Sequence, residues 1–397
     1  LYVYMYSTNT LVQDVALNST TSYVHGLDFD STDVFTGSSV NDFIHVYSGS
    51  FGTINGNGGN DTFTVNTGAT VTALNGTSGN NTYTLTSGAT VTTLTGGSGN
   101  DNITISSTAT ATTVTGGLGT NTLTVLQGGS IGGYTGGAGD DTVVIDSALL
   151  ANSITIDGAG QTTNDNLTIK SYAGASVNLN TKTATLSNFE STTVSGVDST
   201  AGVTLVGYSG AATTLDGSGY SDTLTGGSGN DTIQGQHSAD TLTGGTGSDT
   251  FVYYSTSDAG DTLQDFNGAT NFSGSAGESD KLAFSTSGLG LSSIVYEEIA
   301  WNGSSTALTL TNAAANVVVL TGGTAGTYTN ALTALASGNA TATNAVFIFN
   351  NSASSNAGTL AYTTDMAGGA GTNVSLATFN GVTGDMVHLA AGDFAVV

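Results

Sequence analysis

Four aspartates recur at nine-residue intervals in the middle of the chain, at Asp222, Asp231, Asp240 and Asp249. Each stands sixth in a segment that opens on glycine; the segments are GSGYSDTLT, GGSGNDTIQ, GQHSADTLT and GGTGSDTFV, running from Gly217 to Val252. Carboxylates beside flexible turns offer hard oxygen ligands in adaptable geometry, which suits Ca²⁺ better than the strict octahedron of Mg²⁺. The spacing therefore predicts cation sites, and the element that carries them has to bring successive turns together.

These nonapeptides follow the pattern G-G-x-G-x-D-x-U-x of calcium-binding β-helix repeats. They resemble the β-roll of RTX (repeats-in-toxin) proteins, and both flanks strengthen the likeness. The segment from Val177 is similar to the degenerate strands that precede RTX repeats, and Gly247 to Ser285 is similar to their closing segment. The chain end, from Gly371, resembles the uncleaved export signals of type I secretion substrates. The likeness covers roughly residues 160 to 397 and implies a secreted, calcium-binding protein.

The resemblance also implies a ligand set, in which carbonyls at the second and fourth positions share the ion with the sixth-position aspartate. One side would use Gly227, Gly229 and Asp231 with Gly245, Gly247 and Asp249. The other would use Ser218, Tyr220 and Asp222 with Gln236, Ser238 and Asp240, where the glycine pattern is broken. Further ligands are expected in the closing segment, among Asp258, Asp261, Asp265 and Asp280.

Electrostatics favours a bound ion over a simple turn-forming role for these aspartates. In a β-roll two nonapeptides make one coil, which places Asp222 next to Asp240 at a strand spacing of roughly 4.8 Å. Two bare carboxylates at that distance repel by about 3 kcal/mol at an effective dielectric near 20. We therefore expect Ca²⁺ between them.

A second repeat lies upstream, with a period of 20 residues and copies that begin at positions 55, 75, 95, 115 and 135. Its equivalent column mixes charged and neutral side chains: Asp42, Asp61, Asn81, Asp101, Asn121 and Asp141. Two interpretations stay open. Calcium could bind at Asp61, Asp101 and Asp141, or the column could form a hydrogen-bonded Asn/Asp ladder without metal.

Alternating apolar residues in each 20-residue copy predict strands with one buried face. The core columns are Phe63, Tyr83, Ile103, Leu123 and Val143; Val65, Leu85, Ile105, Val125 and Ile145; Val71, Val91, Ala111 and Ile131; and Leu74, Leu94, Val114 and Tyr134. Two strands per copy, joined by Gly-rich turns, build one coil of a parallel β-solenoid. The fold class is all-β, with 20-residue coils, coils of two nonapeptides, and a carboxyl-terminal β region.

We predict five parts: an amino-terminal arm (1–34), a solenoid (35–160), a β bridge (161–216), the RTX roll with its closing segment (217–290), and a β region with the export signal (291–397). Leu1 to Tyr6 is apolar or aromatic on both faces. This arm either caps the first coil or exchanges into a neighbouring molecule by strand addition.

The amino-acid composition excludes several classes of binding partner. The chain has three Lys, no Arg, 29 Asp and Glu, and a formal charge of -26, which disfavours nucleic acid and anionic membrane surfaces. It has no Cys, no Pro and no apolar run of about 18 residues, so disulfides and an apolar membrane span are excluded. It starts at Leu1 rather than Met, and no charged-then-apolar leader opens it, which leaves open whether a leader or an upstream region is missing. Because its negative charges repel one another, the chain should stay expanded until calcium binds.

Catalytic signatures are scarce, so we expect that the protein is not an enzyme. Gly128 to Gly132 matches G-x-S-x-G without the required strand-elbow-helix context. The histidines are scattered singly, and Glu297 and Glu298 near Trp301 are read as an edge strand. Outward Thr-x-Thr ladders resemble ice-binding faces, although Thr also suits any exposed strand. The first ladder is Thr62/Thr64, Thr82/Thr84, Asn102/Thr104 and Thr122/Thr124, and the second is Thr70/Thr72, Thr90/Thr92 and Thr110/Thr112.

Assembly is the function that these observations favour. The chain resembles RTX-type surface-layer proteins of Gram-negative bacteria, which implies self-association outside the cell after export by type I secretion machinery. The alternatives are a calcium-dependent adhesin or ice-binding solenoid, and an RTX-tailed hydrolase.

Overall fold

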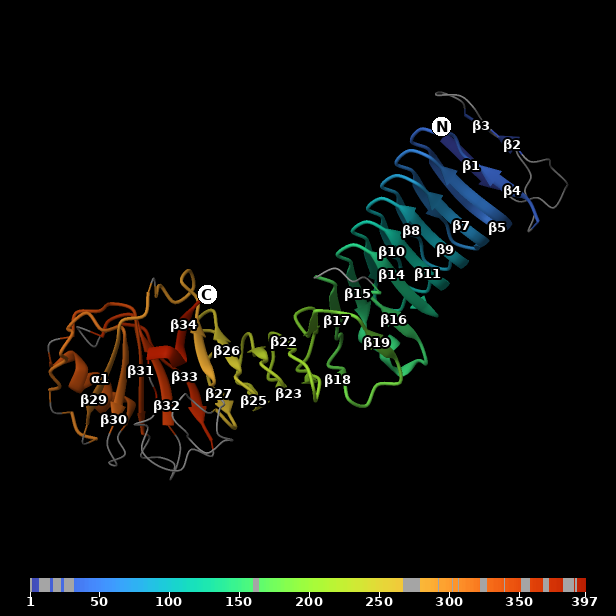
Figure 1. Ribbon diagram of the computed structural model, residues 1–397. Helices are drawn as coiled ribbons and strands as arrows, with labels where there is room; N and C mark the ends of the chain where they lie inside the picture. The colour runs from blue at the N-terminus through green and yellow to red at the C-terminus, as the bar shows by residue number, and fades with distance from the viewer. Residues whose placement is uncertain are drawn as a thin grey trace. The chain divides into compact units, whose positions relative to one another are not determined.

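The computed structural model describes residues 2–6, 15–16, 23–24, 32–159, 164–266, 279–291, 293–301, 303–305, 307–321, 327–338, 340–350, 358–366, 371–380, 389 and 391–397. The chain forms two compact units, Leu1–Tyr172 with Thr181–Thr193, and Ala173–Asn180 with Val194–Val397. Both are β structures built on parallel coils (Figure 1). The predicted fold class is confirmed. The division into five parts remains a prediction.

The first unit is a stack of coils in which each coil gives one strand to each of two parallel sheets. One sheet contains β1 (Tyr2–Tyr6), β3 (Tyr23–Val24), the start of β5 (Phe43–Asn57), β6 (Thr62–Val65), β8 (Thr82–Leu85), β10 (Asn102–Ile105), β12 (Thr122–Val125), β15 (Thr142–Asp146) and β17 (Asn166–Lys170). The other contains β2 (Val15–Ala16), β4 (Val34–Thr36), the end of β5, β7 (Ala69–Thr77), β9 (Thr90–Ser98), β11 (Thr110–Leu118), β13 (Ser130–Ile131), β14 (Gly133–Ala138), β16 (Thr155–Asp157) and β19 (Thr185–Ser187). A 3-10 helix, η1 (Ser147–Ala151), follows β15, and β20 (Ser191–Ser195) lies where the two units divide.

Register explains why the coils fit on one another. Phe63 pairs with Tyr83, Tyr83 with Ile103, and Ile103 with Leu123, each 20 residues further along. All four predicted core columns are buried, and the rings of Phe63 and Tyr83 stack 4.9 Å apart. The long strand of each coil changes side-chain parity between its two buried positions: Val71 and Leu74 both point inward, although they are three residues apart. The hydrophobic columns are thus confirmed.

The second unit begins with shorter coils. Its two parallel sheets contain β18 (Ser176–Asn178), β21 (Thr204–Val206), β23 (Thr223–Ser228), β25 (Thr241–Thr246) and β27 (Asp261–Leu263) on one side, and β22 (Thr214–Asp216), β24 (Thr232–Gln234), β26 (Thr250–Tyr253), β28 (Lys281–Phe284) and β34 (Phe394–Val396) on the other. Leu224 pairs with Leu242, and Ile233 with Phe251, so two nonapeptides do make one 18-residue coil.

A sheet continues from the roll into the carboxyl-terminal region. Its strands are β29 (Tyr296–Ala300), β30 (Val317–Thr321), β31 (Ala345–Asn350), β32 (Gly358–Thr363) and β33 (Asn373–Phe379), and β33 pairs with β27. Here β31, β32 and β33 pair antiparallel, unlike the solenoid strands. The short 3-10 helix η2 (Ala391–Asp393) leads into β34.

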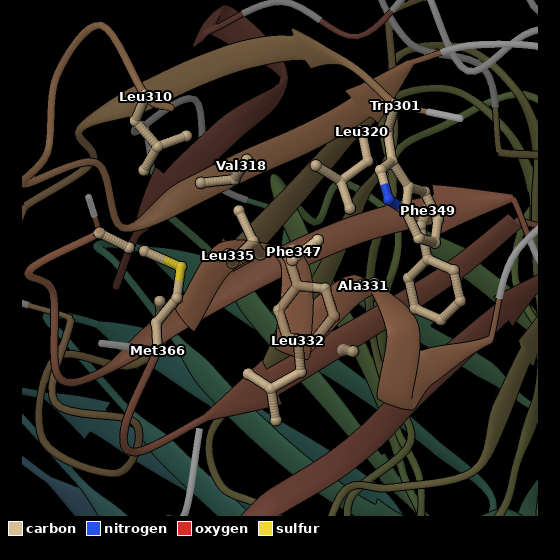
Figure 2. Packing of buried hydrophobic residues seen from close by; sticks show 14 of the residues in the cluster. Trp301, Leu310, Val318, Leu320, Ala331, Leu332, Leu335, Phe347, Phe349 and Met366 are labelled. Atoms are coloured by element: carbon tan, nitrogen blue, oxygen red, sulfur yellow. The ribbon is translucent and has the colours of Figure 1, made fainter. Parts of the chain in front are cut away.

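The same region also contains a helix, although the sequence predicted β structure throughout residues 291–397. α1 (Tyr328–Ala336) begins after Thr327, whose hydroxyl accepts the N–H of Asn330 at 3.2 Å. Its residues Ala331, Leu332 and Leu335 pack into an apolar cluster with Phe347 and Trp301 (Figure 2). The indole N–H of Trp301 donates to the Ser304 carbonyl at 2.7 Å. A conventional side-chain core therefore stabilises this end, whereas the coils depend on repeated columns.

The amino-terminal strand is out of chain order. β1 pairs in parallel with β5 on one side and with β3 on the other. It therefore occupies a coil position between two strands that both follow it in sequence. This pairing is compatible with capping and with exchange between molecules, so the choice between them stays a prediction. Of the predicted arm, residues 1, 7–14, 17–22 and 25–31 lie outside the described residues.

Candidate calcium-binding turns

The nonapeptide aspartates line up along the turns of the roll, and all are buried. The backbone N–H of Asp222 donates to Oδ1 of Asp240 at 2.8 Å, and that of Asp231 donates to Oδ1 of Asp249 at 2.8 Å. The ladder continues into the closing segment, because Asp240 donates to Asp261 and Asp249 donates to Asp280, each at 2.9 Å. One carboxylate oxygen of each aspartate thus links neighbouring coils.

The other oxygen has a different environment. Oδ2 of Asp231 and Oδ2 of Asp240 are buried and have no hydrogen-bond donor among the described residues. Burial raises the pKa of Asp231 to about 7 and the pKa of Asp240 to about 8. Burial likewise raises the pKa of Asp261 to about 8. A buried carboxylate oxygen without a donor is costly when ionised, so these turns need a proton or a cation.

Asp222 differs from the other members of its column. The N–H of Ser218 donates to Oδ2 of Asp222 at 2.5 Å, and the Ser218 hydroxyl donates to Oδ1 at 2.8 Å. That hydroxyl also lies 3.4 Å from the carbonyl of Tyr220, a predicted ligand. The turn is therefore closed internally by a serine.

The broken-pattern turn before Asp240 keeps the conformation of the glycine turns. Gln236 and Ser238 have φ of 72° and 82°, in the left-handed region. The equivalent pairs Gly227/Gly229 and Gly245/Gly247 have φ between 101° and 130°. This turn therefore has two left-handed positions ahead of Asp240, and non-glycine residues adopt them here at a conformational cost.

Two predicted closing-segment ligands have other partners. Asp265 accepts the N–H groups of Gly244 and Gly245, each at 2.8 Å. Asp258 accepts the N–H of Tyr254 at 2.7 Å and the hydroxyl of Ser255 at 3.0 Å. These carboxylates fix local turns and lie outside the two ladders. Residues 267–278 of the predicted closing segment lie outside the described residues.

The 20-residue block carries the same ladder. Asp42 donates its N–H to Asp61, Asn81 to Asp101, and Asn121 to Asp141, at 2.9, 2.7 and 2.7 Å. The hydrogen-bonded column is therefore present. Oδ2 of each of these three acceptors, Asp61, Asp101 and Asp141, nevertheless lacks a donor among the described residues. Burial raises the pKa of Asp61 to about 7 and those of Asp101 and Asp141 to about 6.

The structure also shows a second ladder, formed by asparagines, that was not predicted from the sequence. Asn60 donates its N–H to Oδ1 of Asn41, Asn80 to Asn60, and Asn100 to Asn80, at 2.7 to 2.8 Å. These exposed asparagines immediately precede the aspartate column, and their bonds point in the opposite direction along the stack. The signal was visible as an aligned Asn column at a period of about 20 residues.

The residues present fit a hard divalent cation. Donor-free carboxylate oxygens face glycine positions that have no side chain: a Cβ at Gly226 would overlap Oδ2 of Asp231 and lie 2.5 Å from the Gly244 carbonyl oxygen. No group of three or more His, Asp or Glu side chains suited to a metal occurs among the described residues. Calcium would thus need main-chain carbonyls beside Asp231, Asp240 and Asp249, and once bound it would neutralise the turn.

Among the described residues, the remaining motifs have structural partners. Ser130 of the G-x-S-x-G match lies in β13, and its N–H donates to the Ala109 carbonyl at 2.9 Å. Glu297 accepts the N–H groups of Thr311 and Asn312, so it holds a turn. His45 stacks on Tyr47 at 6.3 Å. His25 and His388 lie outside the described residues.

A comparison with protein-family models finds the RTX calcium-binding nonapeptide repeat, in four copies, at residues 53–71 and 216–251. The second match covers the roll, and the first includes Asp61 of the 20-residue block. No curated protein matches the chain. RTX calcium-binding repeats indicate that it binds Ca²⁺. The four matched repeats and the parallel solenoid together fit an RTX β-roll protein.

Proposed function

We propose that the protein is a secreted, calcium-dependent structural protein that self-assembles into an extracellular surface layer or filament. One observation carries this proposal: buried carboxylate oxygens that have no hydrogen-bond donor among the described residues recur along a regular stack of coils. Such a stack is unfavourable with ionised carboxylates until a cation arrives, so folding follows the calcium concentration. A structural subunit that must stay unfolded inside the cell and rigid outside it requires this property.

RTX repeats are typical of proteins exported by type I secretion, and no helix in the described part of the chain is long and apolar enough to cross a membrane. We place the protein outside a Gram-negative cell, with the type I machinery and further copies of itself as partners. The predicted signal from Gly371 includes β33 and β34, while residues 381–388 and 390 lie outside the described residues. A structural role in place of an enzymatic one is part of the same proposal.

Electron microscopy of the purified chain, with Ca²⁺ and with excess chelator, tests the assembly. Ordered sheets or fibres that form with calcium and disappear with chelator are expected. Dispersed particles under both conditions would contradict the proposal. A chain lacking residues 1–10 separates the two roles of the arm: folded monomers without assembly support strand exchange, and global unfolding supports capping.

One observation favours a second function, a calcium-dependent adhesin or ice-binding solenoid. Thr62, Thr82 and Thr122 repeat in register on the outward face of one sheet, with Asn102 between them. Monomeric rods that bind a surface through this face, and that lose binding when Thr84 and Thr124 become lysine, would support it. Sheets or fibres that survive these substitutions would instead favour assembly.

A further inference from the structure

The 20-residue block contains its own internal comparison, because aspartate and asparagine alternate at one position. We call the coils of Asp61, Asp101 and Asp141 the aspartate coils, and those of Asn81 and Asn121 the asparagine coils. All five side chains accept a backbone N–H from the preceding coil through Oδ1, at 2.7 to 3.0 Å. Their δ2 atoms differ, nitrogen in one class and oxygen in the other.

The asparagine coils satisfy their own turns. Nδ2 of Asn81 donates to the Gly79 carbonyl at 3.0 Å and approaches the Gly96 carbonyl at 3.5 Å. Nδ2 of Asn121 donates to the Gly119 carbonyl at 3.0 Å. The amide thus supplies donors to carbonyls of its own turn and of the next coil.

The aspartate coils present oxygen at the same place. A Cβ at Gly96 would overlap both Oδ2 of Asp101 and the carbonyl oxygen of Gly116. A Cβ at Gly136 would likewise overlap Oδ2 of Asp141 and the Gly158 carbonyl oxygen. Two acceptors therefore converge on a space kept open by glycine, and no donor lies between them among the described residues.

The RTX roll repeats this arrangement. At Gly226 the same two groups converge, Oδ2 of Asp231 and the carbonyl oxygen of Gly244 from the next coil. Gly97 and Gly99, ahead of Asp101, have φ of 109° and 112°, and Gly227 and Gly229, ahead of Asp231, have φ of 125° and 126°. The aspartate coils therefore have the same pair of oxygen atoms and the same turn conformation as the matched repeats, although each of these coils is two residues longer.

We propose that the solenoid block binds Ca²⁺ at its aspartate coils alone, and that the asparagine coils use their side-chain amide in place of the ion. Asp61, Asp101 and Asp141 each supply Oδ2 to one ion, together with turn carbonyls. Asn81 and Asn121 supply an amide donor to the turn carbonyls instead and need no metal. This inference rests on the calcium dependence of the proposed function, and it adds a second set of sites outside the roll.

Calcium stoichiometry of the full chain, measured by equilibrium dialysis, tests the proposal. Asp101→Asn should bind about one ion fewer, and D61N/D101N/D141N about three fewer. Asn81→Asp should bind about one ion more. The matched control Asn80→Asp adds the same charge in the exposed ladder one residue earlier, and it should not add a tightly bound ion.

Far-UV circular dichroism verifies that each variant is folded. We expect Asp101→Asn to fold, because the neighbouring coils already have asparagine at the equivalent position. Unchanged stoichiometry in folded D61N/D101N/D141N would overturn the inference, and so would a folded Asn81→Asp chain that gains no ion. The roll variant D231N/D240N separates the two proposals. If it loses calcium while the block variants do not, the second set of sites is refuted and calcium binding by the roll stands. If no variant loses calcium, the calcium-dependent function is refuted as well.

Discussion

Asparagine and aspartate have nearly the same shape, but in this protein they place opposite hydrogen-bonding groups at one point in the turn. Asn81 donates there, whereas Asp101 can only accept unless it is protonated. The difference turns a self-sufficient coil into one that needs a cation. The turn before Asp222 has a third arrangement, in which the backbone N–H of Ser218 donates to Oδ2 of Asp222 and the Ser218 hydroxyl donates to Oδ1.

Glycine matters for another reason, which a substitution can isolate. Gly117 has φ of 102°, and a Cβ there would overlap the Gly97 carbonyl oxygen, whereas Gly68 has φ of 79° and open space around it. We expect Gly68→Ala to lower the free energy of unfolding by about 1 to 2 kcal/mol through backbone strain. Gly117→Ala should cost about 1 to 3 kcal/mol more through overlap. Urea unfolding with saturating calcium measures both, and equal losses would contradict the close stacking of the turns.

The coil is the element that repeats, since each one contacts its neighbours through parallel strands and the two side-chain ladders. Thr95 and Thr115 are register partners in β9 and β11. Stability of such a stack is approximately a sum of coil and nearest-neighbour contributions. A coil is therefore a unit that can be removed as a whole.

Deleting residues 95–114 should thus leave a folded chain, because Leu94 would then join Thr115 at an equivalent position. We expect an unchanged far-UV spectrum per residue and a modestly lower urea midpoint. Deleting only residues 105–114 removes half a coil and should disrupt the stack, because strands would meet out of register. Comparable stability of the two deletions would show that register does not hold the coils together.

Charge dominates the behaviour of the complete chain. Its formal charge is -26, and in each unit a row of buried carboxylates lies along the turns. Removing calcium leaves these groups with protons as the alternative partner. The solenoid should therefore respond to pH and to calcium through the same side chains.

The metal-free chain should become less stable as pH rises. Burial raises the pKa of Asp240 and Asp261 to about 8 and that of Asp61 to about 7, above an unfolded value of about 4. The folded state then binds more protons than the unfolded state, so stability is fully present below about pH 4 and is lost as pH approaches 8. Urea midpoints in chelator at pH 5 and pH 8 measure this, and a higher midpoint at pH 8 would contradict it.

Calcium should remove that dependence near neutral pH, because the ion favours the ionised carboxylates. The difference between the calcium-loaded and metal-free urea midpoints should therefore be larger at pH 8 than at pH 5. An equal difference at both values would mean that calcium binds through groups that do not titrate in this range.

Much of this architecture follows from residue periodicity. A gapless 20-residue period and an 18-residue pair of nonapeptides specify which residues stack, because a parallel coil can bury Phe63, Tyr83 and Ile103 together only in that register. The aspartate column followed from the same alignment. Alignment could not say which way each δ2 atom points, and hence that Asn81 closes its turn while Oδ2 of Asp101 has no donor among the described residues.

Other features depend on contacts between residues far apart in the chain. β1 lies between β3 and β5, and β33 joins the roll at β27, although neither pairing follows chain order. α1 packs on Phe347 and Trp301, and no repeat in the sequence predicts this cluster. Local periodicity encodes neighbours one coil away, since the same side chains meet at every turn; long-range pairing depends on which buried surfaces remain to be covered once the coils have formed.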